Sequence, residues 1–176
     1  GIIGVDHDGK ISILNRSAEQ LIGSPSSEVM GKPLLDVVPE LAELVAQAQA
    51  KVAPLVNRVI GEAAIDLLRA ENPAGESALG NLIAEAQRPA LGTDFAFMNP
   101  GGIRADILAG PVTFGELFTV QPFGNSLVRM TLTGQQIYDL LNQQWLNQPF
   151  PRILKTSGLT YTWDNNRLIG DRIVEV

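Results

Sequence analysis

The segment Asn99–Arg104, with the sequence Asn-Pro-Gly-Gly-Ile-Arg, brings together residue types that suit the binding of a phosphate. Its paired glycines lack side chains, so their backbone amides can approach an anion closely. Arg104 adds a planar fork of donors that matches the geometry of a phosphate. The alternative interpretation is a structural glycine turn followed by a surface arginine.

The segment Gln121–Asn125, with the sequence Gln-Pro-Phe-Gly-Asn, places an aromatic ring among turn-forming neighbours. A base that stacks on such a ring gains about 1–3 kcal/mol, with little selectivity between bases. Together with the glycine turn, Phe123 would therefore supply the parts of a phosphate and nucleobase site. The alternative for Phe123 is a core phenylalanine that anchors a turn.

Composition excludes several classes of function. The chain has 13 basic and 19 acidic residues and a net charge of −6, which argues against a nucleic-acid partner, because such partners need a basic face. It has no cysteine, so it has no disulfide, thiolate metal site or cysteine nucleophile. No apolar run is long enough to span a bilayer and no signal peptide is visible, so we expect no membrane partner. His7 is the single histidine, and no cluster of metal ligands is recognised.

Local patterns predict the elements of the first third of the chain. The β-branched runs Ile2–Val5 and Ile11–Leu14 flank a polar Asp-Gly turn, which is typical of a β-hairpin. Asn15 has the side chain of a helix N-cap. The composition of Glu40–Val52 favours a helix, which Pro54 should end.

The rest of the chain predicts a mixture of strands and helices. Residues 55–60 have the character of a strand that could pair with Ile65–Leu68, and Asp94–Met98 and Leu127–Leu132 also favour strands. Apolar residues recur at helical spacing over Glu76–Arg88. Two capping boxes predict helix starts, and three strands are expected at the end of the chain. The capping boxes are Thr113 with Glu116 and Thr133 with Gln136. The expected strands are 153–156, 159–163 and 172–176. The predicted class is α+β, with mixed β-sheets and three or four packed helices.

Four motifs from about residue 45 onward resemble the C-terminal domain of bacterial 5′-nucleotidases and UDP-sugar hydrolases. They are, in order, Gly75–Ala86, Asn99–Asp106, Thr113–Phe118 and Gln121–Asn125, the last leading to Leu132-Thr133-Gly134. A single glycine motif is weak evidence, whereas four motifs in the family's order and spacing are strong evidence. Together they cover about three quarters of the chain. The resemblance implies the fold of that domain for residues 45–176.

The resemblance also implies a division of labour. In this family an N-terminal domain with two divalent metal ions hydrolyses the phosphoester, and the C-terminal domain binds the nucleotide. The implied partner is thus a nucleoside monophosphate or a related nucleotide, and neither a catalytic residue nor a cofactor is expected in this chain. The implied substrate-binding residues are Arg69, Asn99, Gly101, Gly102 and Arg104 for the phosphate, Phe123 for the base and Asp171 for the ribose.

The chain departs from the family pattern at the base site. The family clamps the base between two rings, and the second ring lies six residues before the ribose-binding carboxylate. Here that position is Asn165, which cannot stack. Trp163 could replace the ring only if the loop shifts. The departure puts the affinity for the base in doubt.

Residues 1–44 resemble the first half of a PAS domain, as found in sensor histidine kinases. The likeness is carried by Gly4-Val5-Asp6 and by the segments Asp8–Ile11, Leu14–Glu19 and Val29–Leu34. The later strands, which normally complete the PAS ligand pocket, are not found. We therefore expect a partial PAS-like segment at 1–44 and a nucleotidase-like domain at 45–176.

The leading hypothesis is a nucleotide-recognition domain of 5′-nucleotidase type that is inactive without its metal-bearing partner domain. A second hypothesis is a sensory or dimerisation module, because an incomplete sheet exposes an edge that invites a second copy. Two further hypotheses are an engineered or recombinant chimera with no activity and a fragment of a larger enzyme. The compartment stays open, because nucleotidase relatives are periplasmic or secreted whereas PAS segments are mainly cytoplasmic.

Overall fold

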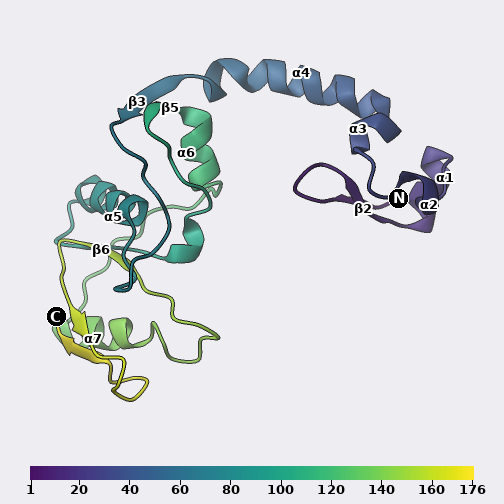
Figure 1. The fold of residues 1–176 in the computed structure, drawn as a ribbon. Helices are drawn as coiled ribbons and strands as arrows, with labels where there is room; N and C mark the ends of the chain where they lie inside the picture. The colour runs from purple at the N-terminus through teal and green to yellow at the C-terminus, as the bar shows by residue number, and fades with distance from the viewer. The chain divides into compact units, whose positions relative to one another are not determined.

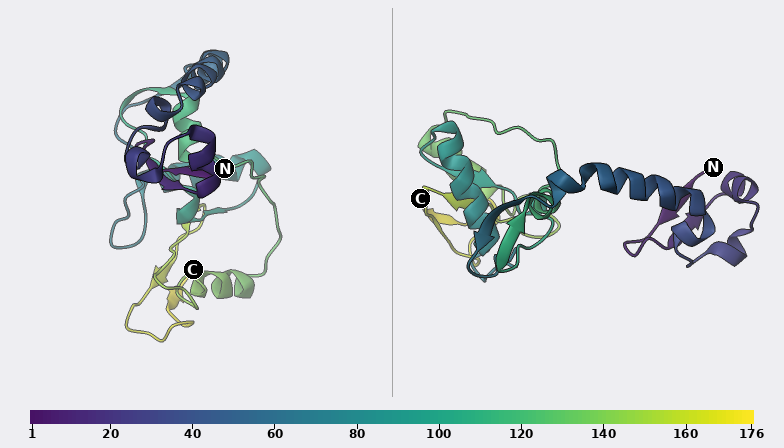
Figure 2. Two further views of the ribbon diagram at one scale, coloured as in Figure 1. Left: turned by 90° about the vertical axis from the view of Figure 1, so that its right-hand side faces the viewer. Right: turned by 90° about the horizontal axis from the view of Figure 1, so that it is seen from above.

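The structure, a computed structural model, describes all residues 1–176 and divides into two compact units, Gly1–Leu55 and Val56–Val176. Figures 1 and 2 show the chain from three sides. The elements form a mixture of helices and small sheets, so the predicted α+β class is confirmed. No helix combines the length and the apolar character needed to cross a membrane.

The first unit begins with the predicted hairpin. Strands β1 (Ile3–Val5) and β2 (Ile11–Leu14) pair antiparallel, and the Asp6 carboxylate accepts the backbone N–H groups of two residues in the turn between them. Helix α1 (Arg16–Ile22) begins where Asn15 accepts the backbone N–H of the third residue after it, as an N-cap does. The short helices α2 (Ser26–Val29) and α3 (Leu34–Val37) follow.

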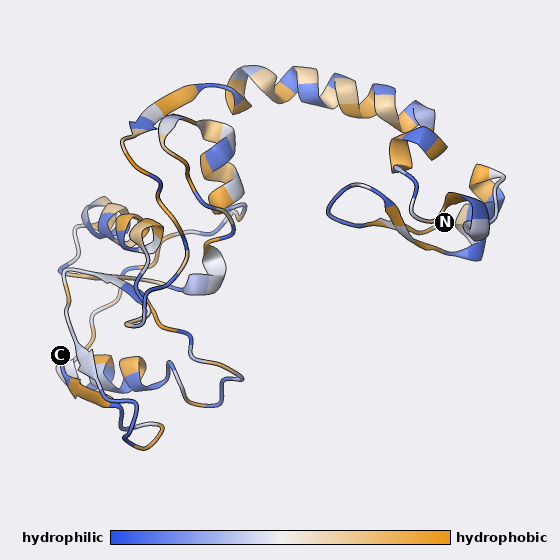
Figure 3. Ribbon diagram, in the orientation of Figure 1, coloured by the Kyte–Doolittle hydropathy of each residue, from blue (hydrophilic) through white to orange (hydrophobic).

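Helix α4 (Pro39–Val56) is longer than the sequence predicted. The expectation that Pro54 ends it was wrong, because this proline lies inside the helix. Proline keeps a φ that is compatible with a helix but has no backbone N–H, so Pro54 costs α4 one intrahelical hydrogen bond in its last turn without ending it there. Apolar and polar residues alternate along α4 (Figure 3), and none of its side chains is buried.

The second unit contains three separate two-stranded antiparallel sheets (Figure 1). Their strands pair as β3 with β5, β4 with β6 and β7 with β8. The bounds are β3 (Val59–Ala63), β4 (Ala96–Met98), β5 (Gly110–Thr113), β6 (Lys155–Ser157), β7 (Thr162–Trp163) and β8 (Ile173–Glu175). The three predicted strands at the end of the chain are therefore confirmed, each shorter than predicted and β6 ending one residue later.

Two strand predictions in this unit were wrong because they considered only local sequence. Residues 55–60 and 65–68 do not pair; β3 instead pairs with the distant β5, and Leu67 exchanges two backbone hydrogen bonds with Ile107. Residues 127–132 alternate in polarity like a strand, but they belong to none of the sheets and have no ladder partner. Val128 and Met130 are consequently exposed.

Helices cover these sheets and close two hydrophobic clusters. Helix α5 (Ala78–Leu91) begins at Ser77, whose side chain accepts the Gly80 N–H, and packs against β4 and β6. Helices α6 (Phe114–Val120) and α7 (Gly134–Asn142) begin at Thr113 and Thr133 in the two predicted capping boxes. One cluster includes Leu79, Met98, Ile103, Ile107 and Val120, and the other Ile137, Leu141, Trp145, Ile153 and Ile173.

Glu85 on α5 links this helix to β6. Its carboxylate accepts hydrogen bonds from the Arg88 guanidinium, at 2.8 Å, and from the Ser157 hydroxyl. These donors, the guanidinium first, lower the pKa of Glu85 below its ordinary value of 4.5. A carboxyl group whose pKa is lowered on folding stabilises the fold above the ordinary pKa and loses that effect as pH falls through the lowered one.

We therefore expect Glu85→Gln to reduce the free energy of unfolding near neutral pH, with the difference from wild type shrinking as the medium becomes acidic. Urea unfolding at a series of pH values measures this difference. Glu62→Gln is the matched control, since Glu62 is exposed and its carboxylate accepts no hydrogen bond. If Glu85→Gln lowers the free energy of unfolding by the same amount at acidic and at neutral pH, the prediction is contradicted.

Candidate functional site

The glycine turn is positioned by β4, which ends at Met98. Asn99 is extended, and residues Pro100–Gly102 form a short 3-10 helix closed by the Gly102 N–H donating to the Asn99 carbonyl at 3.1 Å. Gly102 is buried, and a Cβ added there would collide with the end of the Met98 side chain and lie 3.2 Å from Asn99 Oδ1. Gly101 is exposed, and an added Cβ would meet only Asn99 Nδ2, at 3.7 Å. The two glycines therefore have different roles. Packing requires a glycine at Gly102, whereas Gly101 leaves the backbone of the turn accessible to solvent.

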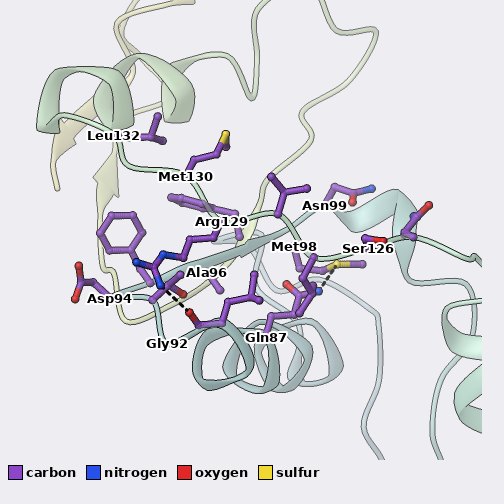
Figure 4. Close-up of a pocket in the computed structure, with 18 of the residues that line it drawn as sticks. Gln87, Gly92, Asp94, Ala96, Met98, Asn99, Ser126, Arg129, Met130 and Leu132 are labelled. Atoms are coloured by element: carbon purple, nitrogen blue, oxygen red, sulfur yellow. Dashed lines mark hydrogen bonds between the residues drawn. The ribbon is translucent and has the colours of Figure 1, made fainter.

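Four of the predicted site residues line one hollow of about 780 Å³ (Figure 4). They are Asn99, Gly101, Gly102 and Phe123. Strand β4 and the end of α5 form part of its lining, and the segment 125–132 lies along another part. Phe123 is 45% exposed, so its ring is not enclosed in the hydrophobic core. The volume is in the range of small-molecule sites, and aromatic walls with a few polar groups are typical of them.

The hollow also contains polar residues that were not among the predicted binding residues, although two of them belong to the Gln121–Asn125 motif. Gln87, Gln121 and Asn125 line it, and so does Arg129. Arg129 extends toward the end of α5 and reaches the Leu91 carbonyl at 3.5 Å, without an ion-pair partner (Figure 4). Arg129 was not identified as a site residue from the sequence, because in the predicted strand over 127–132 it was one polar position in an alternating pattern.

Arg69 lies in a second, smaller hollow of about 450 Å³. Pro100, Asp106 and Lys155 also line it. The Arg69 backbone N–H donates to Asp106 Oδ1 at 2.7 Å, which fixes the backbone of the arginine but leaves its side chain exposed. The two hollows share the glycine turn, since Pro100 lines one and Gly101 the other.

Arg104 and Asp171 line neither hollow. Arg104 is exposed and its Nη1 lies 3.4 Å from the Gly101 carbonyl, so it stays next to the turn. Asp171 is part of the β7–β8 connection, where it accepts the Tyr138 hydroxyl at 3.2 Å and pairs with Arg167 at 3.4 Å. The structure thus gathers the turn and Phe123 in one place and puts Asp171 in another.

The two candidates for a second base-stacking ring have different surroundings. Asn165 is exposed in the β7–β8 turn. Trp163 packs against Trp145 in the second hydrophobic cluster, with ring centroids 5.3 Å apart. Neither residue lines the hollow that contains Phe123. The structure also contains no group of three or more His, Cys, Asp or Glu side chains that could hold a metal ion.

Comparison with known families gives two matches. The model of the 5′-nucleotidase, C-terminal domain, matches residues 56–176, and the model of the PAS fold matches residues 1–81. The first covers well over half of the chain and includes the glycine turn and Phe123. The chain therefore belongs to the family of 5′-nucleotidase C-terminal domains, and the resemblance drawn from its four motifs is confirmed.

Individual relatives agree with this assignment. Endonuclease YhcR of Bacillus subtilis is 34% identical over 180 residues, which cover 93% of this chain and 15% of that protein. A 5′-nucleotidase of Vibrio parahaemolyticus is 47% identical over 64 residues, 36% of this chain and 11% of that protein. The crystal structure of a 5′-nucleotidase precursor from Thermus thermophilus matches with a TM-score of 0.66 and 30% identity, covering 98% of this chain and 34% of that one. The chain thus spans only a minor part of each of these relatives.

The different surroundings of the two glycines lead to a prediction. We expect Gly102→Ala to displace the Met98 side chain and the Asn99 amide, because its methyl group needs the space they occupy. Gly101→Ala is the matched control and should leave both in place. Two-dimensional NMR of the Met98 methyl and the Asn99 side-chain amide measures the shifts, and equal shifts in both variants would contradict the prediction.

Proposed function

We propose that this chain contributes the nucleotide-recognition domain of a 5′-nucleotidase-type phosphoester hydrolase. The proposed ligand is a nucleoside monophosphate, and the proposed domain begins near residue 45, after a PAS-like segment at 1–44. The observation that carries the proposal is the hollow that Asn99, Gly101, Gly102 and Phe123 line together. Family membership supports a nucleotide as the class of ligand.

In this proposal the phosphate binds at the glycine turn. Gly101 is exposed and has no side chain of its own, so its backbone can be approached closely by an anion. Asn99 supplies an amide from the same hollow, while Arg69 and Arg104 flank the turn with exposed guanidinium groups. Arginine is suited to this position because its planar fork can bind two phosphate oxygens at once.

The base in this proposal stacks on Phe123, whose half-exposed ring lines the same hollow. Asn125, also in the lining, lies two residues further along the loop. Stacking on one ring tolerates any base, so we propose little preference between purines and pyrimidines. The proposed ribose contact from Asp171 would need the β7–β8 connection to approach the hollow, because this carboxylate is engaged by Tyr138 and Arg167.

Hydrolysis, in this proposal, belongs to a separate two-metal domain of the kind that the family carries. The proposed role of this chain is therefore binding, and the proposed metal ions lie outside it. The lengths of the relatives are consistent with such a division, since the chain covers 15% of the Bacillus subtilis endonuclease and 34% of the Thermus thermophilus structure.

The competing hypotheses drawn from the sequence differ in support. A chimera without activity is less well supported, because the matches to the Bacillus subtilis endonuclease and the Thermus thermophilus structure span 93% and 98% of the chain and so include both segments. A homodimer through the PAS-like segment stays a prediction. Size-exclusion chromatography at several concentrations tests it, and a monomer at every concentration would contradict it.

We expect Phe123→Ala to weaken the binding of AMP and UMP to a similar extent, by about 1–3 kcal/mol, because one stacked base is lost in either case. Isothermal titration calorimetry measures both affinities. Phe118→Ala is the matched control, since Phe118 is also an exposed phenylalanine but lines neither hollow. No heat with either nucleotide at millimolar concentration would contradict nucleotide recognition itself.

We further expect the purified chain to release no inorganic phosphate from AMP or UMP when Mg²⁺, Mn²⁺ or Zn²⁺ is added. The reason is that the proposed reaction needs a centre of two metal ions, which the family carries on another domain. A colorimetric phosphate assay with each metal in turn is the measurement. Metal-dependent release that copurifies with the chain and disappears on its removal would contradict the proposed division of labour.

A further inference from the structure

Lys155 is the most deeply buried charged residue of the fold, with a side chain that is only 1% exposed. Its ammonium group donates to Glu71 Oε1 at 2.5 Å, to the Ile153 carbonyl at 3.0 Å and to the Gly75 carbonyl. An ammonium group has three N–H donors, so these three acceptors use all of them. Lys155 therefore has no donor left for a ligand, although it lines the second hollow.

The contacts of Lys155 join two parts of the proposed phosphate site. In the β4–β6 ladder it lies opposite Met98, the residue directly before Asn99 and the glycine turn. Its ammonium holds Glu71, two residues after Arg69 in the chain. One side chain thus connects the strand that carries the turn to the segment that carries the arginine.

The backbone up to Arg69 is held by the Arg69 N–H to Asp106 bond, by the pairing of Leu67 with Ile107 and by the Leu68 carbonyl, which accepts the Leu79 N–H. Between Arg69 and Gly75, apart from the Glu71–Lys155 pair, the hydrogen bonds are local ones made by the Asn72 turn. Beyond Arg69, the chain passes through exposed residues until Gly75, whose carbonyl is the second acceptor of Lys155. Without the ammonium group, the Glu71 carboxylate could turn to water and the Gly75 carbonyl would lose a buried donor.

We propose that Lys155 is a positioning residue for the phosphate. By holding Glu71 and the loop to Gly75, it fixes Arg69 beside the Pro100–Gly102 turn and so sets the affinity for the phosphate group rather than for the nucleoside. This inference rests on the proposed function, because it assigns Lys155 a part in nucleotide binding. A purely structural lysine would influence the stability of the fold without distinguishing a nucleotide from a nucleoside.

The experiment compares AMP with adenosine by isothermal titration calorimetry. We expect Lys155→Met to raise the dissociation constant of AMP about tenfold, as loss of one charged hydrogen bond does, and to leave that of adenosine unchanged. In an Arg69→Ala background the same substitution should add no further loss, because Lys155 acts through Arg69. Equal losses for AMP and adenosine, or additive losses with Arg69→Ala, would overturn the inference.

Glu71→Gln is the second variant in case Lys155→Met does not fold. Glu71 is partly exposed, and a glutamine keeps an acceptor for the ammonium, so we expect a smaller loss that is again confined to AMP. An unchanged AMP affinity in both variants would overturn the positioning role.

Amide hydrogen exchange separates this inference from the proposed function. If the wild-type chain binds neither AMP nor adenosine, nucleotide recognition fails, and exchange still decides whether Lys155 fixes Arg69. Faster exchange of the amides of residues 69–75 in Lys155→Met, with unchanged exchange in α7, supports the fixing of this segment. Unchanged exchange over 69–75 overturns it.

Discussion

The buried ammonium of Lys155 constrains the fold around the glycine turn. A charge removed from water needs acceptors around it, and Lys155 finds them only where β6 meets the loop that ends at Gly75. The close approach explains two glycines of the first family motif. An added Cβ at Gly75 would collide with Ile153, and one at Gly80 with the stem of Lys155. Gly75 also has a φ of 83°, which L side chains rarely adopt.

The features that sequence predicted best are those set by neighbours along the chain. The first hairpin, the Asn15 cap and both capping boxes depend on residues within a few positions of one another, and the structure contains them all. Pairing between distant segments was not predictable in this way. The partner of β3 lies some fifty residues away, and residues 127–132 have strand-like alternation but no partner. Alternation indicates which faces differ in polarity, whereas a strand also needs a neighbour for its backbone.

The candidate site shows the same division. The glycine turn and Phe123 were recognisable from residue types and motif order, and the structure places them around one hollow. Arg129 and Lys155 were not recognisable, since neither belongs to a motif: Arg129 is the one charged residue of Leu127–Leu132, and Lys155 lies between Ile153-Leu154 and Thr156-Ser157. Arg129 reaches the hollow because its segment leaves the strand pattern, and Lys155 is buried because a carboxylate 84 residues earlier meets it. Both facts depend on tertiary contacts, which periodicity does not encode.

The pair of indoles at Trp145 and Trp163 has a practical consequence. Both belong to the cluster beneath α7 and β8, and neither lines the hollow that contains Phe123. Their emission should accordingly follow the melting of this cluster while staying insensitive to direct quenching by a base in the hollow. Tryptophan fluorescence should thus report the folding of this domain without direct interference from a nucleotide bound in the hollow.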